Sequence, residues 1–129
     1  MKSTRLKLSM NVSVTPTAAI LRLKGRICLK HEAALFSTIA QQFLKNRQHL
    51  ILELSGIEMI DTAGIGELVL VYMQARAAGS EVRIVAPAKR VRELLDLTNI
   101  ACLFETYSSV DTALDSLPAR WSKLLVSSL

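Results

Sequence analysis

The chain begins with a strict alternation of apolar and polar residues over positions 6–14. The apolar side chains are Leu6, Leu8, Met10, Val12 and Val14. Because successive side chains of a strand point to opposite faces, this pattern predicts a β-strand with one face on a core. After Pro16 a second apolar run, 19–23, predicts another strand. We expect Gly25 to end that strand with a hairpin-like return.

Four later segments have the apolar spacing of helices. Between residues 30 and 45 apolar side chains recur every three or four positions, which is typical of an amphipathic helix. A second helix is predicted from Asp61 to a stop at Gly79. A third follows Pro87, and a short fourth covers 108–117, where Pro118 stops it.

Three more strands are predicted between these helices, over 50–54 with a brief continuation at 57–60 after Gly56, and over 81–85 and 103–107. The first is nearly all apolar, which favours a central strand buried on both faces. This order predicts an α/β fold, with a mixed β-sheet of about four to five strands flanked by about four helices. The later strands should run parallel through right-handed crossovers. A length of 129 residues favours one domain.

Composition supports a folded domain and limits its partners. Half of the residues are apolar and 21% are charged, which is ample for a core. The net charge of +5 is too modest to indicate a nucleic-acid partner. The longest uncharged apolar stretch, 68–75, is far shorter than the roughly 20 residues that cross a bilayer, so no membrane insertion is expected. Without an export signal and with two distant cysteines, we expect a cytoplasmic protein.

Patterns for catalysis, cofactors and metals are weak. Gly64 and Gly66 precede a helix but lack the third glycine of a dinucleotide-binding turn. Cys28 and His31 have the spacing of one edge of a zinc site, yet no ligand pair completes it, which favours a buried thiol and a surface histidine. With two histidines in the chain, no general base stands out. The sequence therefore predicts a protein that is not an enzyme, with no cofactor and no metal.

Two segments leave alternatives open. The basic residues Lys89, Arg90 and Arg92 could contact phosphates, although a solvated helix face is the commoner arrangement. The C-terminal segment 119–129 has amphipathic spacing, and could pack on its own domain, on a second copy or on a membrane surface. We favour packing on its own domain.

The strongest functional candidate is the junction between the central strand and the second helix. Asp61 or Thr62 can cap the free N–H groups of that helix, while Gly64 and Gly66 allow another backbone or a phosphate to come close. This arrangement predicts a contact surface for another protein. Simple helix capping is the alternative.

The order of strands and helices, together with the junction sequence IDTAGIG at 60–66, resembles the STAS domain of bacterial anti-sigma factor antagonists. The likeness covers residues 5–117 as a single domain and leaves 118–129 as a tail. It implies a regulator that binds a serine-kinase anti-sigma factor and so releases a sigma factor. The implied contact residues are Asp61, Thr62, Ala63 and Gly64.

The resemblance also implies a phosphorylated residue directly before the motif glycine, where this chain has Ala63. The usual phosphoserine is thus replaced, and Thr62 remains as an alternative phosphoacceptor. Two other functions fit the same resemblance. One is a STAS subunit that binds the ATPase of a lipid ABC transporter, and the other is a homo-oligomeric scaffold in a stress-signalling assembly.

Overall fold

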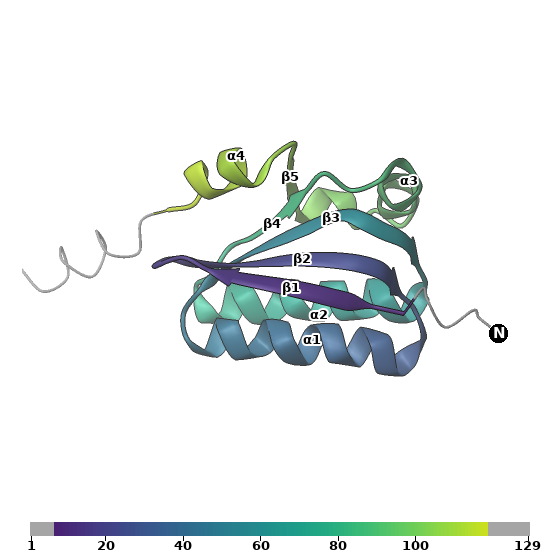
Figure 1. Cartoon of the computed structure of the whole chain (residues 1–129), viewed down its shortest axis with the longest axis horizontal. Helices are drawn as coiled ribbons and strands as arrows, with labels where there is room; N and C mark the ends of the chain where they lie inside the picture. Colours follow the sequence, from purple (N-terminus) through teal and green to yellow (C-terminus); the bar gives the residue numbers. More distant parts are fainter. Residues whose placement is uncertain (1–6, 119–129) are drawn as a thin grey trace, which may run out of the picture.

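The computed structural model describes residues 7–118, which form a five-stranded sheet with helices on both faces (Figure 1). The strands lie in sequence order across the sheet: β1 (Ser9–Val14), β2 (Ala18–Ile27), β3 (His49–Ile60), β4 (Val82–Val85) and β5 (Glu105–Tyr107). β1 and β2 are antiparallel, and all later pairs are parallel. The predicted mixed sheet and the predicted order of elements are confirmed.

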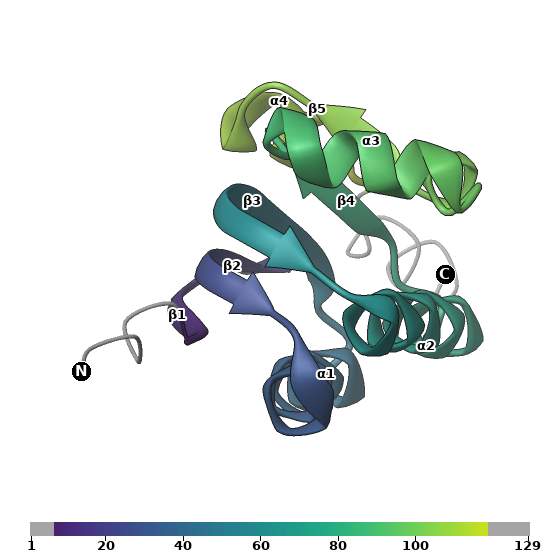
Figure 2. The same ribbon diagram turned by 90° about the vertical axis from the view of Figure 1, so that its right-hand side faces the viewer.

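Four α-helices connect these strands: α1 (Leu29–Lys45), α2 (Thr62–Ala78), α3 (Lys89–Leu97) and α4 (Val110–Asp115). A short 3₁₀ turn, Ala101–Leu103, follows α3. Helices α1 and α2 lie side by side on one face of the sheet, whereas α4 lies on the opposite face (Figures 1 and 2). α3 packs against β3.

The two faces of the sheet bury two separate cores. The larger core lies beneath α1 and α2 and includes Leu52 of β3 and Phe36 of α1, both fully buried. The smaller core lies beneath α4 and includes Ile51 of β3 and Ala113 of α4. Neighbouring residues of β3 thus face different cores, which confirms the predicted central strand buried on both faces.

β2 differs from its prediction because it does not end at Gly25. It continues to Ile27 and pairs in parallel with β3, while the antiparallel return lies at residues 15–17, between β1 and β2. Gly25 has a φ of 106° and precedes a register shift at which β3 has one extra residue, Glu58, so a glycine in the left-handed region lies inside β2, beside a bulge in β3. A bulge breaks the alternation in the sequence without ending the strand.

β3 runs without a break from His49 to Ile60, so the strand predicted at 50–54 and its brief continuation over 57–60 are one strand that passes through Gly56. Gly56 makes this extension possible, because a Cβ atom there would lie 2.9 Å from the carbonyl oxygen of Leu23 on β2. β5 is shorter than predicted because the 3₁₀ turn takes up residues 101–103. The proposed docking of the tail 119–129 lies outside the described residues.

Candidate functional site

Asp61 links the starts of two helices. It follows β3 in an extended conformation and is the N-cap of α2, where Oδ1 accepts a hydrogen bond of 2.9 Å from the N–H of Gly64. Its Oδ2 accepts a second bond of 2.9 Å from the N–H of Leu29, the first residue of α1. Of the two capping candidates in the sequence, Asp61 is the one that accepts the bond. One carboxylate therefore fixes the β2–α1 and β3–α2 turns together.

The backbone at Leu29 explains why this second bond matters. Leu29 has a φ of 62°, in the left-handed region that costs a residue with a Cβ atom about 1–2 kcal/mol. The hydrogen bond to Asp61 helps to hold that conformation. Leu29 is half exposed, so the turn presents an apolar side chain to solvent.

The same two hydrogen bonds set the charge of the junction. The backbone N–H groups of Leu29 and Gly64 stabilise the carboxylate of Asp61 and lower its pKa, with the contribution from Leu29 the larger. Asp61 therefore remains ionised at neutral pH. The start of α2 carries a fixed negative charge that complements the positive end of the helix dipole.

Gly64 is needed for close packing within the protein. It is buried, and a Cβ atom on it would lie 2.2 Å from the carbonyl oxygen of Ile27 and 2.6 Å from Cγ1 of Ile60. Gly66 is exposed, and a Cβ atom there would meet nothing within 4 Å. The close approach expected at both glycines therefore occurs only at Gly64, and the approaching backbone is that of β2.

The four predicted contact residues are neighbours in space but differ in exposure. Thr62 is exposed, and Asp61 is half-buried. Ala63 is half-buried and packs against the larger core, while Gly64 is buried. Of the four, only Thr62 is exposed.

The sequence did not predict a groove that lies beside the junction. It has a volume of about 260 Å³ and lies between the end of β3 and one side of α3. Its apolar lining includes Met59 and Leu97, which are 49% and 82% exposed, together with Leu94. Arg90 and Glu93 supply its charged rim. In the sequence, a methionine near the end of a strand was the one signal that could have pointed to this groove. The groove itself depends on the position of α3, which local sequence does not give.

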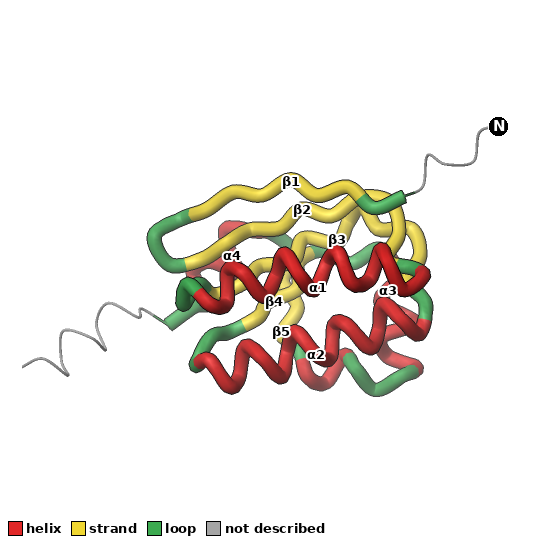
Figure 3. The backbone as a smooth tube through the Cα atoms, turned by 90° about the horizontal axis from the view of Figure 1, so that it is seen from below, coloured by secondary structure: helices red, strands yellow, loops and turns green. Residues whose placement is uncertain are grey.

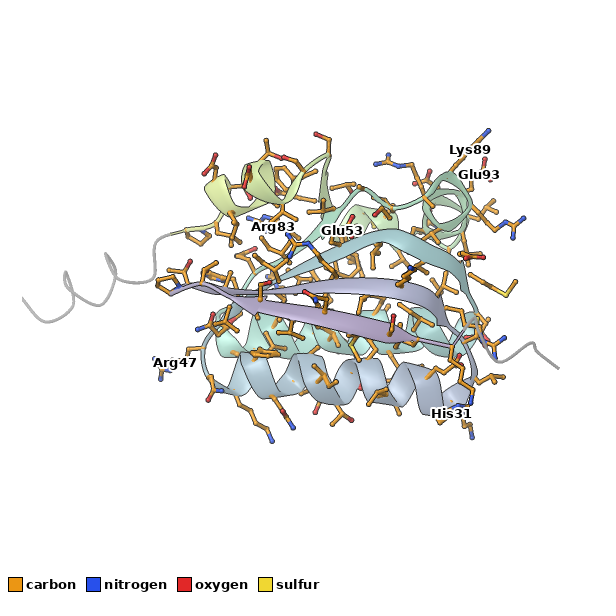
Figure 4. The ribbon with its side chains drawn as sticks, viewed as in Figure 1. His31, Arg47, Glu53, Arg83, Lys89 and Glu93 are labelled. Carbon is orange, nitrogen blue, oxygen red and sulfur yellow. The ribbon has the colours of Figure 1, made fainter. Side chains whose placement is uncertain are left out.

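The start of α1 carries a partly buried ion pair close to this site. Glu32 is 3% exposed and accepts hydrogen bonds of 3.2 and 3.3 Å from Nε of Arg26, and one of 3.3 Å from the N–H of Cys28. Cys28 is buried, and this burial together with the charge of Asp61 raises the pKa of its thiol. His31 is exposed on α1, at the same end of the molecule as Lys89 and Glu93 of α3 (Figure 4). The predicted buried thiol and surface histidine are confirmed.

Among residues 7–118, no three His, Cys, Asp or Glu side chains lie close enough to share a metal ion. None of the helices in this part of the chain is long and apolar enough to span a membrane.

Comparison with known proteins identifies the family. The profile of the STAS domain matches residues 9–113. The chain belongs to the STAS domain family. A protein of Thermotoga neapolitana named "Putative anti-sigma factor antagonist TM1081 homolog" is 28% identical to it over 83 residues, or 64% of this chain and 74% of the relative.

Solved STAS structures share the fold. An anti-sigma factor antagonist from Mycobacterium paratuberculosis superposes with a TM-score of 0.77 and 19% identity, over 90% of this chain and 98% of the other. The Bacillus cell fate determinant SpoIIAA in its phosphorylated form has a TM-score of 0.66 and 14% identity, over 83% of this chain and 97% of the other. The predicted resemblance to a STAS domain of the anti-sigma factor antagonist type is confirmed.

Proposed function

We propose that this STAS protein is a non-catalytic regulator that binds a serine-kinase anti-sigma factor and so releases a sigma factor. The observation that carries the proposal is the preorganised junction, in which Asp61 bonds to both Leu29 and Gly64 and leaves Thr62 exposed. A surface that is already rigid loses little conformational entropy when a partner docks.

The groove beside the junction supports a protein partner. Met59 and Leu97 are large apolar side chains that remain exposed next to a charged rim. Interfaces commonly combine apolar anchors with a polar border that excludes water. We place the partner across Thr62 and this groove, with Asp61 supplying fixed negative charge.

Thr62 is also the proposed site of regulation. Ala63 has no hydroxyl group and packs against the larger core, whereas the side chain of Thr62 faces solvent. A phosphate on Thr62 would add about two negative charges beside ionised Asp61. The N-terminus of α2 tolerates this charge, so we expect the fold to survive while the fit to the partner changes.

Binding of the purified anti-sigma factor kinase from the same genome tests the proposal. Thr62→Glu should weaken the complex at least tenfold in calorimetry, because it adds a charge to a surface that loses water on binding. Thr38→Glu is the matched control, since Thr38 is exposed on α1 away from the junction, and should bind like the wild type. Failure of the wild type to bind any such kinase would contradict the proposal, as would equal binding by Thr62→Glu.

A labelling experiment tests the phosphoacceptor separately. Incubation with the kinase and ATP should label the wild type but not Thr62→Val, which keeps the shape of the side chain. Equal labelling of Thr62→Val, or no labelling of the wild type, would contradict the assignment of Thr62.

A further inference from the structure

The two edges of the sheet differ in how they are protected from pairing with another strand. β5 has three residues, and its exposed Glu105 carboxylate lies 3.8 Å from Nε of Arg83. β1 has six residues, SMNVSV, without a charge. No charged residue occurs anywhere from 8 to 21. Short length and charge are the usual protections of an edge strand, and β1 has neither.

β1 also leaves apolar side chains uncovered. Val12 and Val14 pair with Leu21 and Ala19 of β2, which belong to the larger core, so these valines point to the same face of the sheet as α1. Even so, Val12 is 40% and Val14 60% exposed. The view from below shows why, because β1 lies beyond the edge of α1 (Figure 3).

Apolar side chains on one flank of α1 add to the uncovered valines of β1. Gln41 and Lys45 face α2, since they line a cavity with residues of that helix. Helical spacing places Leu35 and Ile39 on the other flank, toward β1. Leu35 is 47% exposed, and Ile39 is half-buried. We therefore use the name strip for these apolar residues on the β1 side of this face, which remain partly or largely exposed: Val12, Val14, Leu35 and Ile39.

We propose that β1 pairs with β1 of a second copy of this chain, antiparallel and about a two-fold axis, to give a continuous ten-stranded sheet. In such a contact each strand meets itself reversed, so any charge on β1 would face a like charge nearby. The uncharged sequence of β1 satisfies that condition. The valines of both copies would lie on one face and cover the two strips. This inference does not rest on the proposed function, because the groove is lined by residues of α3 and of the end of β3, and α3 and β1 lie on opposite sides of strands β2 and β3 (Figure 2).

Sedimentation equilibrium between 1 and 200 μM tests the proposal. The wild type should show a dimer, and Val12→Lys should raise the dimer dissociation constant at least tenfold, because two lysines would then approach across the axis. Leu97→Lys is the matched control, since Leu97 is an exposed leucine on α3, and it should dimerise like the wild type. A wild type that is monomeric over this range, or an equal constant for Val12→Lys, would overturn the proposal. Circular dichroism should show that both variants remain folded.

Disulfide trapping tests the geometry of the pairing. Single cysteines at positions 10–14 are introduced into Cys102→Ser, which removes the exposed native thiol. In a two-fold antiparallel pair only residues at the axis face their own copies at a distance that suits a disulfide. Cross-linking should peak at one position, or at two adjacent ones, and fall on both sides. Uniform cross-linking along β1, or none, would contradict antiparallel self-pairing.

Discussion

Replacing Asp61 by alanine should destabilise the protein by about 2–3 kcal/mol. Loss of the N-cap bond to Gly64 costs about 1 kcal/mol. Loss of the hydrogen bond from the N–H of Leu29 adds about 1.5 kcal/mol, because the carboxylate that accepts it is charged. With an unfolding entropy of about 2.1 cal/mol/K per residue, a 2.5 kcal/mol loss in a chain of 129 residues lowers Tm by about 9 °C.

Urea denaturation at pH 7 measures this effect. Asp61→Asn keeps a side-chain acceptor but loses the charge, so we expect a smaller loss of about 1 kcal/mol. Glu58→Ala is the control, because Glu58 is an exposed carboxylate on β3 close to the junction. The free energy of unfolding of Asp61→Ala should differ from that of this control by more than about 0.5 kcal/mol, since removal of an N-cap side chain typically costs at least that much. A smaller difference would refute the stabilising role of these hydrogen bonds.

The pH dependence gives a second test of the same contacts. The folded pKa of Asp61 is lower than its unfolded value, so its stabilising contribution is complete above the unfolded pKa of about 3.9. The contribution is lost as pH falls through the lower, folded value. The free energy of unfolding should therefore fall more steeply on acidification in the wild type than in Asp61→Asn. Parallel pH profiles would contradict an ionised Asp61 held by Leu29 and Gly64.

Two further predictions concern the glycines of α2 and the two thiols. Gly64→Ala should destabilise the fold by about 3 kcal/mol or more in urea denaturation, because the added Cβ would collide with the backbone of Ile27. Gly66→Ala should be neutral or stabilise α2 by up to about 1 kcal/mol. Equal effects of the two substitutions would contradict the packing described. Iodoacetamide should modify exposed Cys102 much faster than Cys28 in the native protein at pH 7.5, because Cys28 is buried and its pKa is raised. Mass mapping of the modified peptides checks this, and faster modification of Cys28 would show that the turn before α1 opens readily.

Periodicity predicted most of the elements but misjudged two strands for one reason. Gly25 and Gly56 look like strand breakers in the sequence, yet both lie inside strands. Gly25 adopts a positive φ beside a bulge in β3, and Gly56 allows the backbone of β2 to come close. Whether a glycine ends a strand or lies within it depends on the neighbouring strand, which local sequence does not reveal.

The candidate site was predictable in part. The capping chemistry of Asp61 followed from its place between strand and helix, because an N-cap interaction is local. Its bond to Leu29, 32 residues away in the chain, required the β2–α1 and β3–α2 turns to meet. The groove likewise required α3 to lie beside the end of β3.

By itself, the amino-acid sequence determined the α/β class, the order of the elements and the junction at residues 60–66, because these depend on periodicity and on contacts between near neighbours. The tertiary structure alone decided which residues of that junction are exposed. It also decided that Gly64 packs on β2 and that β1, whose sequence carries no charge, lies at an edge of the sheet. Exposure and strand order depend on contacts between distant segments, and such contacts exist only once the chain has folded.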